Sequence, residues 1–170
     1  MSNRSRAVRE TQLGFPIVAL GASAGGLAAF EAFFTGLGGV SGLKGAAFVL
    51  IQHLDPVHKS LLTELIQRRT ELPVTEVTAP TALVPGHVYV ITPGHDLTLT
   101  QGILDISVPV ETRGRRLPID HFLRSLALGA GKSAVGVILS GTGNEGASGI
   151  RNLKAAGGLV VVQDPSTAEY

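Results

Sequence analysis

Short continuous runs of apolar residues alternate along the chain with segments that carry apolar residues at helical spacing. The runs cover residues 17–20, 46–51, 135–139 and 159–162. Continuous runs of this length are typical of strands that are buried on both faces of a parallel sheet. Spacings of three and four residues predict helices at residues 27–37, 61–66, 118–129 and 145–156. The alternation of the two patterns indicates parallel strand–helix–strand units.

The segment from residue 88 to residue 106 has a different pattern. Short strands are predicted at 88–91, 97–100 and 103–106, with turn residues between them. Residues 97–100 alternate apolar and polar, which is the period of a half-exposed strand. We interpret all three strands as a small antiparallel insertion beside the main sheet. The predicted fold class is a three-layer α/β domain with a mostly parallel, doubly wound, Rossmann-like sheet.

The length of 170 residues is compatible with one domain and one sizeable core. We expect residues 1–14 to form a polar tail and residues 15–170 to form the α/β domain. We also expect the domain to be truncated at its C-terminus, because the sequence stops at Tyr170 directly after a Pro-Ser turn.

The amino-acid composition then excludes several classes of protein to which this chain could belong. Hydrophobic residues make up 44% and charged residues 16%, which argues against disorder, and a formal charge of +1 gives no sign of a nucleic-acid partner. The absence of cysteine excludes disulfides, thiolate metal ligands and a cysteine nucleophile. No H-E-x-x-H motif is present, so no metal is expected. No stretch approaches the ~18 apolar residues of a membrane span, so we expect no membrane insertion and a cytoplasmic location.

The first candidate site follows the apolar run at 17–20. Gly21-Ala22-Ser23-Ala24-Gly25 matches G-x-S-x-G between a predicted strand and a predicted helix, which is the arrangement of a nucleophile elbow. In that arrangement Ser23 is the nucleophile and the amide of Ala24 stabilises an oxyanion. Two other interpretations stay open. One is a Gly-rich turn that allows close packing of strand and helix. The other is a phosphate-binding loop. A dinucleotide-binding site, however, requires an acidic residue at the end of the second strand, where this sequence has Gln52-His53.

The second candidate is His53, which follows the predicted strand at 46–51. A serine nucleophile needs a general base within hydrogen-bond reach, and a histidine one strand away is placed to be that base. A lone histidine at a strand edge is more often only a polar residue. Because His53 occurs together with the Ser23 motif, we favour the interpretation of His53 as a general base.

The third candidate is the loop Ser140-Gly141-Thr142-Gly143-Asn144-Glu145-Gly146. It offers backbone amides for an oxyanion and the Glu145 carboxylate to orient a histidine. It is equally compatible with a plain connection that places Glu145 in the first turn of the next helix, and spacing alone leaves both open. Asp55 and Asp120 are alternative partners for the histidine.

Three arginines, Arg113, Arg115 and Arg116, precede the predicted helix at 118–129. We interpret them as a solvated surface, with contact to an acidic protein substrate as the alternative.

Together these segments resemble the catalytic domain of CheB-type chemotaxis receptor methylesterases. The resemblance rests on residues 17–26, on Gln52-His53 and on residues 136–146, with support from 85–90 and 116–120. It extends from about Phe15 to Tyr170. The spacing and the Gln163-Asp164-Pro165 segment are more similar to the methylesterase region of fusions with a methyltransferase.

The resemblance implies a protein-glutamate methylesterase, a serine hydrolase that cleaves glutamyl γ-methyl esters on chemotaxis receptors and releases methanol. Glutamine deamidation often accompanies that activity. The resemblance carries over Ser23 as nucleophile, His53 as base, and the amides of Ala24 and Thr142 as oxyanion donors. Glu145 stands where the family has an aspartate as the third member of the triad.

The resemblance also sets the expected partners. They are a methylated chemoreceptor or similar signalling protein, with a fused or associated methyltransferase domain, and no cofactor is needed. The alternative function is a catalytically impaired pseudoesterase that acts as a docking or regulatory domain.

Overall fold

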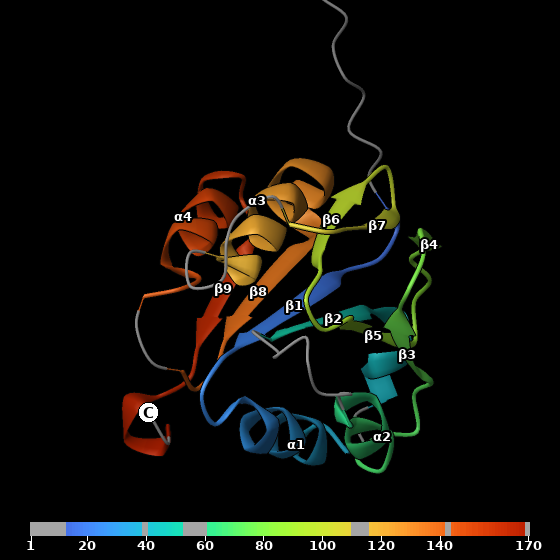
Figure 1. Cartoon of the computed structure of the whole chain (residues 1–170), viewed down its shortest axis with the longest axis vertical. Helices are drawn as coiled ribbons and strands as arrows, with labels where there is room; N and C mark the ends of the chain where they lie inside the picture. The colour runs from blue at the N-terminus through green and yellow to red at the C-terminus, as the bar shows by residue number, and fades with distance from the viewer. Residues whose placement is uncertain (1–12, 39–40, 53–60, 110–115, 142–143, 169–170) are drawn as a thin grey trace, which may run out of the picture.

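The computed structural model describes residues 13–38, 41–52, 61–109, 116–141 and 144–168 (Figure 1). The strands are β1 (Ile17–Ala22), β2 (Ala47–Gln52), β3 (Val74–Val77), β4 (Thr81–Ala82), β5 (His87–Ile91), β6 (Asp96–Thr100), β7 (Ile103–Ser107), β8 (Ala134–Ile138) and β9 (Leu159–Val162). The α-helices are α1 (Gly26–Gly36), α2 (Leu62–Gln67), α3 (Pro118–Ala130) and α4 (Ala147–Ala155). Short 3₁₀ helices cover Ser41–Gly45, Gly131–Ser133 and Pro165–Thr167.

The main sheet has six strands in the order β3-β5-β2-β1-β8-β9, and every neighbouring pair is parallel. Helices α1 and α2 lie on one face of this sheet and α3 and α4 on the other (Figure 1). Each face has its own apolar core, one containing Phe30 and Phe34 of α1 and the other Phe122 and Leu126 of α3. The predicted three-layer α/β fold with a mostly parallel sheet is confirmed.

The predicted antiparallel insertion is correct in part. Strands β4, β7 and β6 form a separate three-stranded antiparallel sheet. The strand predicted at 88–91, however, is β5, which lies between β3 and β2 in the main parallel sheet, so its assignment to the insertion was wrong. Residues Val88 to Ile91 are all buried, as expected for an interior parallel strand. Their continuous apolar run already carried this signal.

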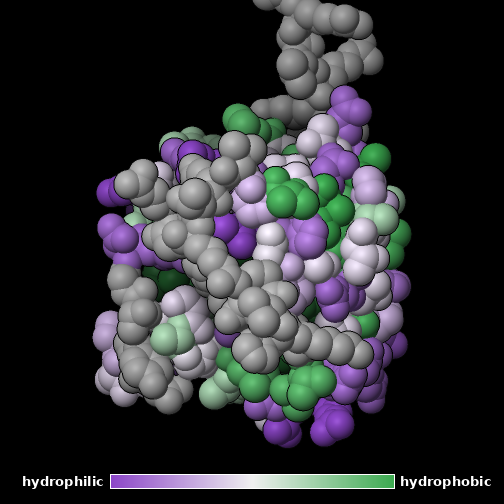
Figure 2. Space-filling model, in the orientation of Figure 1, coloured by the Kyte–Doolittle hydropathy of each residue, from purple (hydrophilic) through white to green (hydrophobic). Residues whose placement is uncertain are grey.

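The predicted helices are confirmed, with shifts at their ends. Helix α4 begins at Ala147, two residues after Glu145, and α3 extends to Ala130, one residue past Gly129. On α2, Leu62 and Ile66 are buried, but Leu61 is 55% exposed and does not belong to the buried face. Figure 2 shows hydrophobic residues at the surface at the bottom of the view, near α1 and α2.

Two strands of the described chain, β3 and β4, have no counterpart in the sequence prediction. Strand β3 is short and carries Thr75 and Glu76, and β4 has only two residues, so neither gives a clear periodic signal. Within the described ranges, no helix is long and apolar enough to cross a membrane.

Helices α3 and α4 pack closely at Gly149. A methyl group on this glycine would lie 2.6 Å from Cβ of Leu123 and 3.2 Å from Cα of Asp120. Both atoms are attached to or part of the α3 backbone, so they cannot retreat by a rotamer change. The absence of a side chain at residue 149 therefore sets the distance between the two helices.

We predict that Gly149→Ala destabilises the protein by about 1 to 3 kcal/mol, because the added methyl overpacks this contact. The free energy lost by overpacking should exceed the ~1 kcal/mol by which alanine is more favourable than glycine in a helix. Urea unfolding followed by circular dichroism measures the difference. The matched control is Gly36→Ala at the end of α1, where an added methyl meets nothing within 4 Å. If both variants unfold at the native midpoint, the packing account of Gly149 is wrong.

Candidate active site

The loops after β1 and β8 are joined by backbone hydrogen bonds at the carboxyl edge of the sheet. The Leu139 N–H donates to the Gly21 carbonyl at 2.9 Å, and the Ser23 N–H donates to the Ser140 carbonyl at 3.0 Å. The pairing of the two parallel strands thus continues beyond their ends. It brings together the first and third candidate segments of the sequence.

The turn after Ser23 is tight, and Gly25 makes it possible. The Gly26 N–H donates to the Ser23 carbonyl at 3.0 Å, and Gly25 has φ of 72°, in the left-handed region that favours glycine. Ser23 itself is not at positive φ. The backbone strain expected at the serine of a nucleophile elbow is therefore absent here, because the left-handed residue lies two positions later.

The Ser23 hydroxyl is held between two backbone segments. The Ala24 N–H donates to Ser23 Oγ at 2.6 Å. On the other side, a methyl group on Gly141 would lie 3.2 Å from both Cβ and Oγ of Ser23, so only glycine fits there without crowding. Ser23 is half-buried and lies at the amino end of α1, where the helix dipole favours negative charge.

The second candidate segment reaches the same turn through Gln52, the last residue of β2. Its side-chain Nε2 donates to the Ser23 carbonyl at 3.4 Å. Gln52 also packs against Gly26, where a methyl group would lie 2.8 Å from Nε2. The predicted base His53 and the predicted oxyanion residue Thr142 lie outside the described residues, as does Asp55.

Glu145 lies in the loop before α4, and its carboxylate reaches the start of α3. Its Oε1 accepts a hydrogen bond from the Ile119 N–H at 2.9 Å. The interpretation that placed Glu145 in the first turn of the following helix was wrong, because α4 begins only at Ala147. Gly146, which precedes α4, has φ of 91° and allows the chain to turn there.

Asp120, in the first turn of α3, faces α4. Its side chain is buried, with 3% exposure, and Oδ1 accepts a hydrogen bond from the Gly149 N–H. This oxygen serves the junction of the two helices. The sequence analysis gave Asp120 only as an alternative partner for His53, and the sequence pattern did not indicate its bond to Gly149.

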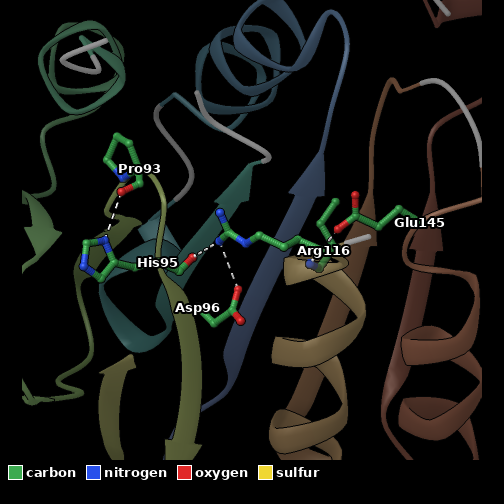
Figure 3. Close-up of polar contacts among 6 residues, drawn as sticks. Pro93, His95, Asp96, Arg116 and Glu145 are labelled. Carbon is green, nitrogen blue, oxygen red and sulfur yellow. Dashed lines mark hydrogen bonds and ion pairs between the residues drawn. The ribbon is translucent and has the colours of Figure 1, made fainter. Parts of the chain in front are cut away.

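Arg116 is nearly buried, so the interpretation of this arginine as part of a solvated surface was wrong. Its side chain is 9% exposed, and Nη2 donates to the His95 carbonyl at 2.8 Å and to Asp96 Oδ1 at 3.2 Å. Figure 3 shows its side chain running from the start of α3 toward His95 and Asp96, while Glu145 lies on the other side of the helix start. Arg113 and Arg115 lie outside the described residues.

Gln163 supports the loop after β8, and sequence reasoning gave it no role at the site. Its Oε1 accepts a hydrogen bond from the N–H of Ser140, a residue with 3% exposure, at 2.8 Å. Its Nε2 donates to the carbonyl and hydroxyl oxygens of Thr167 at 3.1 and 3.3 Å. The sequence signals were its place just after the predicted strand at 159–162 and its part in the Gln163-Asp164-Pro165 segment.

The described part of the chain contains the histidines His87, His95 and His121. No group of three or more His, Asp or Glu side chains there is arranged to hold a metal ion. The described part of the candidate site contributes the Ser23 hydroxyl, the Ala24 amide and the Gln52 side chain.

Comparison with known proteins identifies the family. The family model for the CheB methylesterase matches residues 18–170. The chain belongs to the CheB methylesterase family. The predicted resemblance is therefore confirmed over nearly the whole sequence.

Two CheB relatives illustrate the similarity. A protein-glutamate methylesterase/protein-glutamine glutaminase of Pseudomonas putida is 33% identical over 162 residues, which cover 95% of this chain and 47% of that protein. A second one, of Pseudomonas aeruginosa, is 30% identical over 155 residues, which cover 89% of this chain and 43% of that protein. The chain thus spans less than half the length of these CheB relatives.

The fold agrees with a solved CheB structure. The crystal structure of the Thermotoga maritima CheB methylesterase catalytic domain superposes with a TM-score of 0.78 at 26% identity. The match covers 92% of this chain and 84% of that one. The sheet order and layers described above are therefore those of a CheB catalytic domain.

We predict that Gln163→Met destabilises the protein by about 1 to 3 kcal/mol, because it leaves the buried Ser140 amide without this acceptor. Methionine matches glutamine in length, so packing changes little. The control is Thr167→Val, which removes only the exposed hydroxyl partner of Gln163 and should shift stability by less than about 0.5 kcal/mol. Equal urea midpoints for the two variants would show that the Gln163–Ser140 bond does not anchor the loop.

Proposed function

We propose that this chain is a serine-dependent carboxylic ester hydrolase that removes methyl groups from glutamyl γ-methyl esters and releases methanol. The observation that carries the proposal is the setting of Ser23 Oγ, which lies 2.6 Å from the Ala24 amide and against Gly141 at the carboxyl edge of the sheet. Family membership supports the reaction class, and the named relatives are protein-glutamate methylesterases.

In the proposed mechanism, Ser23 Oγ attacks the carbonyl carbon of the ester while His53 accepts the hydroxyl proton. The tetrahedral intermediate then collapses, and His53 returns the proton to the departing methoxide, which leaves as methanol. The product of this step is an acyl-enzyme on Ser23. Water activated by His53 then hydrolyses it, which regenerates the serine and releases a free glutamate side chain.

The negative oxygen of the tetrahedral intermediate needs donors that are already in place. We assign this role to the backbone amides of Ala24 and Thr142. The Ala24 amide already points at Ser23 Oγ. Ser140, two residues before Thr142, is anchored by Gln163 and by the Ser23 amide, which supports a fixed start for that loop.

We assign Glu145 as the carboxylate that orients His53 and stabilises its protonated form. A carboxylate can accept several hydrogen bonds, so the bond to the Ile119 amide is compatible with a second one to His53. Glutamate occurs as the acid in other Ser-His triads, which supports its use here in place of aspartate.

The same acyl-enzyme chemistry extends to glutamine side chains, with ammonia as the leaving group. Both named relatives are also protein-glutamine glutaminases, which supports deamidation as a second reaction at Ser23. We propose a methylated chemoreceptor or similar signalling protein as the substrate, a fused or associated methyltransferase domain as neighbour, and the cytoplasm as the location.

The second candidate function is a pseudoesterase that keeps the fold for docking or regulation. The presence of Glu145 in place of the aspartate implied by the resemblance favours it. An activated serine separates the two functions, because a docking domain has no need of one.

We predict that a fluorophosphonate probe labels Ser23 in the native protein and that Ser23→Ala abolishes both labelling and methanol release from methylated receptor. Alanine fits the tight turn, so the free energy of unfolding should change by less than about 1 kcal/mol. The control is Ser107→Ala at the exposed end of β7, which should label like the native protein. An unlabelled but folded native protein would support the pseudoesterase, and a Ser23→Ala variant with native turnover would exclude Ser23 as nucleophile.

For His53 we predict that the rate of ester hydrolysis rises with pH between about 5.5 and 7.5, the range in which an imidazole ordinarily loses its proton. The neutral imidazole is the form that accepts the serine proton, so activity is lost on the acid side. The measurement is a pH profile of kcat/KM for methanol release. A flat profile in that range, with chemistry limiting the rate, would contradict the role of His53.

A further inference from the structure

The contact between α3 and α4 contains two carboxylate-to-amide bonds that run in opposite directions. Glu145, which precedes α4, accepts from the Ile119 amide in the first turn of α3. Asp120, in α3, accepts from the Gly149 amide in the first turn of α4. The first amides of a helix have no partner within the helix, so each helix start is satisfied from the segment of the other.

Neither helix can be capped by the residue directly before it. Those residues are Leu117 and Gly146, which have no polar side chain. The two crossed bonds therefore take the place of ordinary caps. Breaking either bond would leave a helix-start amide without its carboxylate partner.

The packing around these bonds leaves little room for Glu145 to move. A methyl group on Gly146 would lie 2.9 Å from Cδ1 of Ile138 and 3.3 Å from Cγ2 of Ile119. Together with the contact at Gly149, this holds the residues that follow Glu145 against α3. A shift of α3 relative to α4 would therefore displace the Glu145 carboxylate.

The Glu145 carboxylate lies at the N-terminus of α3, next to the Ile119 amide. A helix N-terminus stabilises a negative group in its first turn. The ionised carboxylate is the form that can stabilise a protonated His53 in the proposed mechanism. The same hydrogen bond thus orients the carboxylate at a helix start.

We infer that the start of α3 holds the Glu145 carboxylate for the reaction and that Asp120 is a positioning residue, fixing α3 against α4. The inference rests on the proposed function. It also gives a reason for glutamate at this position. Aspartate is shorter by one methylene, about 1.5 Å, so from the same backbone position it would not reach the Ile119 amide.

The first test separates the two uses of Glu145. Glu145→Gln keeps an oxygen for the Ile119 amide but loses the charge, so the urea midpoint of unfolding should stay near native while kcat falls about 100-fold. Glu145→Asp keeps the charge but not the reach, so it should lower both the midpoint and, by about 10-fold, kcat. A Glu145→Asp variant with native midpoint and native kcat would overturn the inference.

The second test concerns Asp120, with methanol release measured at a temperature where circular dichroism shows every variant folded. Asp120→Ala should lower kcat by about 10-fold with KM little changed, because the substrate contacts are untouched. Asp120→Asn keeps an acceptor oxygen for Gly149 and should restore most of the rate. The matched control is Tyr89→Phe, which removes hydrogen bonds to Val84 and Ala82. It should lower the urea midpoint and leave kcat at the native value.

The outcomes distinguish the inference from the proposed function. If Asp120→Ala and Tyr89→Phe both keep the native kcat, Asp120 has only a structural role. That result would overturn the inference and leave the proposed function intact. A native protein without Ser23-dependent turnover would overturn the proposed function, and the inference with it. Loss of kcat in Asp120→Ala with rescue by Asp120→Asn would support both.

Discussion

The candidate site depends on the continuation of the β1–β8 pairing beyond the strands. Parallel strands end at the same edge of a sheet, but their loops usually diverge from there. Here the Leu139 and Ser23 amides keep the two chains paired for further residues. Ser23 is thereby held against the Ser140–Gly141 segment, and Gln52 from β2 reaches the same turn from the other side. The position of Ser23 is thus fixed by hydrogen bonds that continue the pairing of the two central strands, β1 and β8.

Much of the fold could be predicted from the sequence, because buried parallel strands leave continuous apolar runs. Strands β1, β2, β8 and β9 were found in this way. Strand β5 has the same kind of run, but it was grouped with the two strands that follow it along the chain, β6 and β7, and so was assigned to the wrong sheet. Strand β3 was missed because an edge strand is half-exposed and its polar residues hide the pattern. Local pattern therefore identified strands better than it assigned them to sheets.

The site could be predicted only where motif and position coincided. The place of Ser23 after a buried strand follows from G-x-S-x-G and strand order together. The partners of Glu145, Asp120 and Arg116 did not follow, because each bonds to a backbone or side-chain group about 20 or more residues away. Charged residues near a helix start are usually exposed, so a statistical expectation pointed to solvent for Arg116. Only the tertiary arrangement shows that these charges are used inside the molecule.

The pair formed by Arg116 and Asp96 has a consequence for the small antiparallel sheet. This sheet is attached to α3 twice, through Arg116 before the helix and through Ser125 within it, whose hydroxyl accepts from the Leu99 amide at 3.0 Å. These bonds tie the position of the small sheet to that of the helix. A change in the length of the β5–β6 connection would be transmitted to the residues before α3 through the bond between Arg116 and the His95 carbonyl. The length of that connection therefore limits where the start of α3 can lie, and with it the Ile119 amide from which Glu145 accepts a hydrogen bond.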